Sequence, residues 1–154
     1  MIVRDYVPAD VDALIDLFRE AVRRVAIRDY SEAQVRAWAP DMAEREKWVE
    51  RRASRPTWVA EIDGKIAGFT DLEPDGHVDM MYVHPDFKGR GVANALMAKV
   101  EEAAAEQKLG RLYTEASITA KPFFEKKGFR VIAPQTVHVR GQDLVNYRME
   151  KFMT

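Results

Sequence analysis

Two glycines that flank an arginine, Gly89 and Gly91, stand just ahead of an apolar run with helical spacing. Glycine adopts backbone conformations that other residues avoid and lets the chain approach a ligand closely. The first N–H groups of a helix have no partner within the helix and attract anions. The segment "KGRGVAN", residues 88–94, is therefore predicted to bind a phosphate group.

Two common phosphate loops fit this segment poorly. The dinucleotide fingerprint G-x-G-x-x-G requires a small residue at Asn94 and a turn directly after a strand, but residues 84–87 separate Val83 from Lys88. A P-loop requires G-K-[ST], which the sequence lacks. A nucleotide-binding oxidoreductase is therefore disfavoured.

The elements that position the glycine segment begin with a short alternating strand at 2–6 and a helix at 7–22. Residues 31–54 predict two shorter helices separated at Pro40, the first capped by Ser31. The first half of the chain therefore supplies helices around the site.

Three strands joined by short turns are expected as an antiparallel meander at 57–63, 65–73 and 77–83. Because a strand, helix, strand crossover normally joins parallel neighbours, strands four and five are expected to be parallel. Later elements are predicted as a helix at 92–109 that ends at Gly110, a strand at 111–117, a short helix at 118–127, and closing strands at 129–134 and 136–150. The sequence thus predicts one α/β domain, residues 1–154, with a mixed, mostly antiparallel sheet.

The composition narrows the function further. The chain has 47% hydrophobic residues, and its 24 basic and 25 acidic side chains give no overall basic field for nucleic acid or an anionic membrane. The absence of cysteine excludes disulfides and a cysteine acyl-enzyme, and it favours a reducing cytoplasm. Three scattered histidines predict no metal site, and no apolar run reaches membrane-spanning length. A soluble cytoplasmic protein is expected.

The stretch "YVHPDFKGRGVANAL", residues 82–96, resembles motif A of the GNAT superfamily of acetyl-coenzyme A dependent N-acetyltransferases. In that family [QR]-x-x-G-x-[GA] follows the fourth strand and opens the third helix. Lysine at the first place keeps the charge but loses the planar fork of arginine, so backbone amides are expected to bind the pyrophosphate. The pattern is occupied here by Lys88, Gly89, Arg90, Gly91, Val92 and Ala93.

A second stretch, "ASITAKPFFEKKGFRV" at residues 116–131, resembles motif B of the same family. Ser117 ends a strand and Ala120 allows close approach, while Phe123 and Phe124 supply apolar surface for a pantetheine arm. The two motifs together imply the GNAT fold over nearly the whole chain. In that fold strands four and five splay apart.

The resemblance also implies how acetyl-CoA binds as a co-substrate. The pantetheine would pair with strand four, where Met81, Tyr82 and Val83 contribute backbone groups and one N–H polarises the acetyl carbonyl. Arg90 and Lys126 are the cations expected near the phosphates. The acceptor would be a primary amine of a small molecule or peptide, acetylated directly in a ternary complex.

A base must deprotonate the acceptor, because a lysine-like amine at neutral pH is protonated in all but about one part in a few thousand. Asp79 on strand four and Glu115 on strand five are the candidates, with His77 behind them. Alternation along strand four would place His77 and Asp79 on one face. The alternative is that both carboxylates only cap or salt-bridge a strand end.

The acid that protonates the leaving thiolate is less obvious, because Phe124 stands where many family members carry tyrosine. Tyr147 is the first choice, since a closing strand would carry it beside the gap, although its ring could instead belong to the core. Ser117, Tyr113, Tyr82 or water could substitute, or the thiolate, with a pKa of about 8.5, could leave unprotonated.

Two hypotheses of function remain at this point. The first is an N-acetyltransferase, and the alternative, motivated by Phe124, is a catalytically idle acetyl-CoA-binding module. Trp38 and Trp48 are expected either to pack at the edge of the core or to form the wall of an acceptor pocket. The oligomeric state, monomer or homodimer, stays open.

Overall fold

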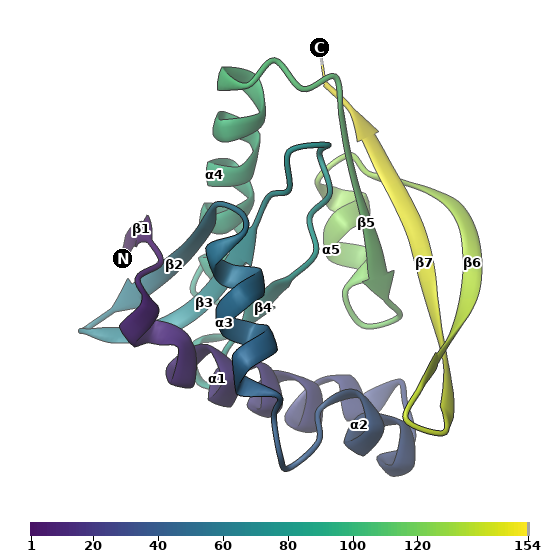
Figure 1. Cartoon of the computed structure of the whole chain (residues 1–154). Helices are drawn as coiled ribbons and strands as arrows, with labels where there is room; N and C mark the ends of the chain where they lie inside the picture. Colours follow the sequence, from purple (N-terminus) through teal and green to yellow (C-terminus); the bar gives the residue numbers. More distant parts are fainter. Residues whose placement is uncertain (154) are drawn as a thin grey trace.

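Two antiparallel sheets, which diverge between β4 and β5, organise the computed structural model of this chain, which describes residues 1–153 (Figure 1). The first sheet has the order β1 (Ile2–Asp5), β2 (Thr57–Ile62), β3 (Lys65–Asp71) and β4 (Met81–Val83). The second sheet has the order β5 (Arg111–Ser117), β7 (Gln142–Phe152) and β6 (Arg130–Val139). One parallel bridge, from His77 to Tyr113, links them. The predicted α/β fold with a splayed parallel pair is confirmed.

The helices lie against these sheets as α1 (Val11–Arg24), α2 (Glu32–Trp38), α3 (Arg45–Ala53), α4 (Val92–Glu106) and α5 (Lys121–Lys126). The predicted cap of α2 is confirmed, because Ser31 Oγ accepts a hydrogen bond from the Gln34 N–H at 3.1 Å. A short 3-10 turn at Pro8–Asp10 precedes α1. Within residues 1–153, no helix has the length and apolar composition needed to cross a membrane.

Strand β4 is shorter than predicted, because residues 77–80 do not join the first sheet. There the backbone bonds to a side chain, since Asp71 Oδ1 accepts from the N–H groups of Asp79 at 2.8 Å and Met80 at 3.1 Å. The expected alternation of His77 and Asp79 along a strand is therefore wrong. The Asp71 carboxylate on β3 thus takes the place of the backbone hydrogen bonds that would have extended β4.

Two other boundaries differ from the sequence prediction. Helix α4 ends at Glu106 instead of residue 109, and Lys108 behind it takes a left-handed conformation with φ of 57°. The closing strands form one long hairpin, β6 and β7, that turns at Arg140 and Gly141. Glycine at the second place suits its φ of 83°.

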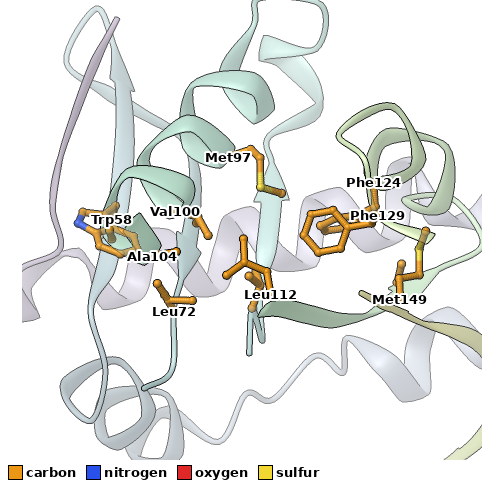
Figure 2. Packing of buried hydrophobic residues seen from close by; sticks show 12 residues of the cluster. Trp58, Leu72, Met97, Val100, Ala104, Leu112, Phe124, Phe129 and Met149 are labelled. Carbon is orange, nitrogen blue, oxygen red and sulfur yellow. The ribbon is translucent and has the colours of Figure 1, made fainter. Parts of the chain in front are cut away.

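A hydrophobic cluster joins the two sheets at one end (Figure 2). Its members come from β2, α4, β5, α5 and β7 and include Trp58, Val100, Leu112, Phe124 and Met149. Val100, Leu112 and Met149 are fully buried. Because this core closes the sheets near the start of β5, the space between them opens toward the ends of β4 and β5.

Helix α4 packs closely against the first sheet at Gly68 on β3. A Cβ atom at Gly68 would lie 2.7 Å from Cγ1 of Val92 and 2.9 Å from the carbonyl oxygen of Tyr82. Only glycine leaves room for this contact. It places the first turn of α4 directly beside β4.

Candidate active site

Four neighbouring pockets run in a row from the glycine segment to helix α3. We name them the loop pocket (about 280 Å³), the channel (about 190 Å³), the gap pocket (about 230 Å³) and the α1–α3 pocket (about 370 Å³). Each shares lining residues with the next: Val83 and Lys88 between the first two, Met81, Ser117 and Ala120 between the channel and the gap pocket, and Trp38, Asp79 and Tyr82 between the last two. The row can therefore hold one long ligand and a second, smaller one.

The glycine segment forms the loop pocket. Gly89 and Gly91 have φ of 79° and 77°, and no atom lies within 4 Å of a Cβ built at either position. Gly91 caps α4, so the free N–H groups of the first turn begin there. The segment thus leaves open space in front of a helix N-terminus, as an anion site requires.

Most of the residues expected to bind coenzyme line the row of pockets. The loop pocket contains Lys88, Gly89, Gly91, Val92, Ala93 and Phe123, and Met81, Tyr82, Val83, Ser117, Ala120 and Phe124 line the channel or the gap pocket. Arg90 and Lys126 are exposed and line none of the four pockets. Their role toward phosphate stays a prediction.

Strand β4 presents an open edge to the gap between the sheets. The His84 N–H donates to the Ala67 carbonyl at 2.8 Å, and the register pairs Phe69 with Tyr82. In an antiparallel pair the hydrogen-bonded residues alternate. The N–H and C=O groups of Met81 and Val83 therefore point away from β3, where a ligand can use them.

The gap pocket brings Ser117 and Asn146 together, since the two residues are register partners on β5 and β7. Ser117 Oγ accepts from the Ala120 N–H at 3.0 Å. Asn146 Oδ1 is buried without a hydrogen-bond partner within residues 1–153. Asn146 was missed from the sequence, where one amide in an alternating strand gives no signal. Phe124 also lines this pocket and offers no hydroxyl.

The three candidate tyrosines lie in different surroundings. Tyr147 packs against the core cluster, with Lys121 Nζ 5.3 Å from its ring centre, and lines none of the four pockets. The Tyr113 hydroxyl donates to Asp75, and this hydrogen bond raises the pKa of Tyr113 to about 12. Burial raises the pKa of Tyr82, which lines three of the pockets.

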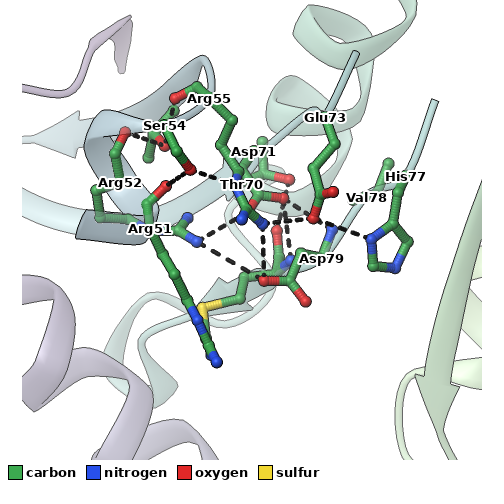
Figure 3. A network of polar contacts seen from close by, with 12 residues as sticks. Arg51, Arg52, Ser54, Arg55, Thr70, Asp71, Glu73, His77, Val78 and Asp79 are labelled. Carbon is green, nitrogen blue, oxygen red and sulfur yellow. Dashed lines mark hydrogen bonds and ion pairs between the residues drawn. The ribbon is translucent and has the colours of Figure 1, made fainter. Parts of the chain in front are cut away.

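Asp79 belongs to a cluster of charges at the boundary of the gap pocket and the α1–α3 pocket (Figure 3). Arg55 Nη1 lies 2.5 Å from Glu73 Oε1 and 3.1 Å from Asp79 Oδ2. Arg52 Nη2 lies 2.9 Å from Asp71 Oδ2 and 3.8 Å from Asp79 Oδ2. Asp79 Oδ1 makes no hydrogen bond or ion pair within residues 1–153, since the contacts of this carboxylate use Oδ2. One carboxylate oxygen is thus fixed by arginine while the other stays available.

Beneath this cluster, the Arg52 and Asp71 side chains are completely buried. Burial raises the pKa of Asp71, and the Arg52 charge and the Met80 N–H oppose that shift. A buried ion pair of this kind contributes less to stability than its short distance suggests, because both charges lose their hydration. Its clearest effect is to fix the backbone at Asp79 and Met80.

His77 lies between two carboxylates. Its Nδ1 is 3.1 Å from Glu73 Oε1 and its Nε2 is 2.8 Å from Glu115 Oε1. Burial disfavours the charged imidazole, but the hydrogen bond and charge of Glu115, the hydrogen bond of Glu73 and the charge of Asp79 outweigh burial and raise the pKa of His77 to about 9. His77 is therefore protonated at neutral pH, and Glu115, which lines the gap pocket, is paired with it.

The same region gathers possible metal ligands, which the spacing of the histidines did not predict. One ligand atom each from Glu73, His77 and Asp79 lie within 4.8 Å of one another. Arg55 Nη1 contacts two of these side chains and already supplies a positive charge there. The cluster is explained as an ion-pair network, and we assign no metal to it.

Trp38 and Trp48 pack against aromatic neighbours and also line a pocket, and their role toward an acceptor stays a prediction. Trp48 packs against Phe18 with ring centres 5.3 Å apart, and Trp38 meets Tyr30 edge to face at 5.4 Å. Both also line the α1–α3 pocket. Tyr30 is itself anchored to β7, since its hydroxyl donates to the Val145 carbonyl at 2.6 Å.

Comparison with known proteins agrees with this geometry. Residues 26–151 match the acetyltransferase (GNAT) domain. The chain is 37% identical over 147 residues to the uncharacterized N-acetyltransferase YafP of Escherichia coli (strain K12), covering 96% of this chain and 93% of that one. The GCN5-related N-acetyltransferase of Rhodopseudomonas palustris superimposes with a TM-score of 0.94 at 34% identity, covering 99% and 95% of the two chains.

A more distant structure shows the same fold with coenzyme bound. The PaiA N-acetyltransferase of Thermoplasma acidophilum, solved in complex with coenzyme A, has a TM-score of 0.80 at 19% identity and covers 99% of this chain and 98% of that one. The family match confirms the predicted family, the enzyme class and acetyl-CoA as co-substrate. The chain belongs to the GNAT family and is an acetyl-CoA dependent N-acetyltransferase.

Proposed function

We propose that this enzyme moves the acetyl group of acetyl-CoA to a primary amine of a small molecule or peptide in a direct ternary complex. The observation that carries the proposal is the position of Asp79, which lines both the gap pocket and the α1–α3 pocket. A carboxylate at this boundary stands where a thioester in the gap would meet an amine from the other side.

In this proposal acetyl-CoA lies along the row of pockets. Its pyrophosphate binds to N–H groups at the start of α4 in the loop pocket, with Lys88 contributing charge. The pantetheine runs through the channel and pairs with the open edge of β4. The thioester carbonyl then accepts a hydrogen bond from the N–H of Met81 or Val83, which stabilises the oxyanion of the tetrahedral intermediate.

Transfer begins when the ammonium loses a proton to Asp79 Oδ1, directly or through a water molecule. Glu115, on the gap side, is the alternative acceptor of that proton. The amine nitrogen then attacks the thioester carbon and a C–N bond forms. The C–S bond breaks to release the thiolate, and the nitrogen passes its remaining surplus proton through water to this thiolate, which becomes the thiol of coenzyme A. The Ser117 hydroxyl, at the boundary of the channel and the gap pocket, donates a hydrogen bond to this thiolate.

A direct reaction is favoured over an acyl-enzyme. The sequence has no cysteine, and the recorded hydrogen bond of Ser117 Oγ comes from a backbone N–H, not from a side-chain base. Both ring nitrogens of His77 are occupied by Glu73 and Glu115, so the imidazole is not free to activate a nucleophile. Acetyl-CoA and the amine are therefore bound together before transfer.

Replacing Asp79 with asparagine tests the proposal. Free-thiol release from acetyl-CoA with a panel of amines should fall by about a hundredfold or more in kcat/KM for Asp79→Asn. Acetyl-CoA affinity, measured by calorimetry, should stay unchanged. Asp63→Asn, which removes the same charge from the exposed β2–β3 turn, is the matched control.

Three outcomes would change the assignment. Full activity of Asp79→Asn together with a large loss of activity in Glu115→Gln would assign the role of base to Glu115. Acetyl-CoA binding without thiol release for any amine would support the idle module. Release of free thiol before the amine is added, with a labelled protein, would establish an acyl-enzyme.

A further inference from the structure

The α1–α3 pocket is lined by an excess of positive side chains that the proposed chemistry does not use. Its cations come from α1, α3 and the β6–β7 turn, while its acids are Glu44 and Asp79. An amine-binding pocket is expected to carry the opposite balance, since the acceptor arrives as a cation. The positive lining residues are Arg19, Lys47, Arg51, Arg52 and Arg140.

Three of these cations are engaged by the protein itself. Arg52 pairs with Asp71. The Arg140 Nη1 donates to the Ala37 carbonyl at 2.8 Å, and the Arg19 Nη2 donates to the Asp41 carbonyl at 3.0 Å. These contacts anchor the three side chains, although the Arg52 Nε and Nη1 atoms are buried without a hydrogen-bond partner within residues 1–153.

The other two, Lys47 and Arg51, lie one turn apart on α3 and face the pocket together. Lys47 Nζ is 2.6 Å from Glu44 Oε2. Arg51 has no side-chain hydrogen bond or ion pair within residues 1–153, and Figure 3 shows its side chain extending away from the Asp71 and Asp79 cluster. Arg51 is thus a free guanidinium at the wall of a pocket.

Glu44 shows that this part of the pocket favours a carboxylate. The hydrogen bond and charge of Lys47 lower the pKa of Glu44, and the charges of Arg140 and Arg51 act in the same direction. Lys47 and, at 3.8 Å, Arg140 Nη2 contact this carboxylate, while Arg51 acts on it through its charge without a direct ion pair. A second oxyanion would be attracted to the same place, and Arg51 offers it a planar fork of donors.

We propose that the acceptor is a small amine whose far end carries an oxyanion, a carboxylate or a phosphate, bound by Arg51. This inference rests on the proposed function, because it places the ammonium of the same molecule at Asp79. The aromatic side chains of Phe18, Trp38 and Trp48 line the pocket and can contact the body that joins the two charged ends. Polycationic amines would be repelled by the surplus positive charge.

The test compares amines that differ only at the far end. The probes are β-alanine with β-alaninamide, L-phenylalanine with L-phenylalaninamide, phosphoethanolamine for the phosphate, and spermidine as the polycation. At least one oxyanion probe should be acetylated with kcat/KM roughly tenfold or more above its neutral partner, and spermidine should be poorest. The oxyanion probe with the highest kcat/KM identifies the group that Arg51 prefers, a carboxylate or a phosphate.

The variant Arg51→Gln separates charge recognition from amine basicity. It should lower kcat/KM for the oxyanion probe roughly tenfold, mainly through KM, and leave the neutral partner unchanged. Arg51→Lys should restore part of the preference. Arg45→Gln is the matched control, because it removes the same charge from α3 outside the pocket and should alter neither probe.

A binding measurement keeps this inference separate from the proposed function. The fluorescence of Trp38 and Trp48 can report binding of each probe to protein saturated with coenzyme A. Selective binding of oxyanion probes that depends on Arg51 would support the inference even if these probes are not acetylated. The proposed function, by contrast, is refuted only if no amine of the wider panel releases thiol from bound acetyl-CoA. Equal binding of acid and amide, or equal selectivity in Arg51→Gln, would overturn the inference.

Discussion

Gly68→Ala should disturb the active site from a position that contacts no ligand. The added Cβ would lie 2.7 Å from Val92 Cγ1, 2.9 Å from the Tyr82 carbonyl oxygen and 3.1 Å from Leu96 Cδ1. The two side-chain contacts can relax by rotation, but the carbonyl oxygen can move only with β4. Overpacking of this kind typically destabilises a protein by about 1–3 kcal/mol.

Part of that loss is offset, because alanine in a strand is favoured over glycine by about 0.5–1 kcal/mol. The midpoints of these two ranges leave a net loss of about 1 kcal/mol, or roughly 2–4 °C in Tm for a chain of this size. The strain also separates the start of α4 from β4, which flank the loop pocket. Acetyl-CoA affinity should therefore fall about threefold to tenfold.

Thermal unfolding and calorimetric titration with acetyl-CoA measure the two effects. Gly110→Ala is the control, since Gly110 has no neighbouring atom within 4 Å of a Cβ, and its stability should stay equal or rise slightly. A Gly68→Ala protein with the Tm and coenzyme affinity of the wild type would refute the claim that this close approach positions α4.

Three further predictions concern His77, Gly91 and Tyr147. The pKa of His77 is raised in the folded protein from 6.5 to about 9. Its ion pairs therefore stabilise the fold fully below about pH 6.5, and this stabilisation is lost as the pH rises through about 9. The contribution is about 1–2 kcal/mol after allowing for the partial exposure of the side chain. The decline of Tm between these pH values should be smaller in His77→Gln, and equal declines would contradict the assignment. Gly91→Val forces a branched side chain to φ of 77° and should weaken acetyl-CoA binding at least tenfold while the protein stays folded. The control Gly110→Val should leave the affinity unchanged, and unchanged affinity of Gly91→Val in calorimetry would place the pyrophosphate elsewhere. Tyr147→Phe should keep kcat within about threefold, whereas a hundredfold loss at unchanged Tm would identify Tyr147 as the acid.

The order of the elements and the conformation of the glycine segment could be predicted from the sequence, because their signals are local. Glycines at 89 and 91, ahead of an apolar helix, predict both a left-handed turn and free N–H groups. The cap at Ser31 is local in the same way. Local signals of this kind need no knowledge of distant neighbours.

The length of β4 could not be predicted, since it depends on a side chain from another strand. Asp71 takes the N–H groups of Asp79 and Met80, and nothing in the alternation of residues 77–83 reveals that competition. The end of α4 was misplaced because Lys108 adopts a left-handed conformation that usually favours glycine.

The charge of the α1–α3 pocket is also a tertiary property. Arg19, Lys47, Arg51 and Arg140 come from three segments that are distant in the sequence. Each of these side chains taken alone has the ordinary interpretation of a solvated surface charge. Their common pocket becomes visible only when α1, α3 and the β6–β7 turn are placed in space.

The open edge of β4 has a consequence for solubility as well as for chemistry. An unpaired strand edge is a template on which another molecule can add a strand, and proteins usually protect such edges. Here the second sheet stands across the gap, where an approaching strand would have to dock. The enzyme can thus keep the hydrogen-bonding groups of Met81 and Val83 free for a substrate while shielding them from aggregation.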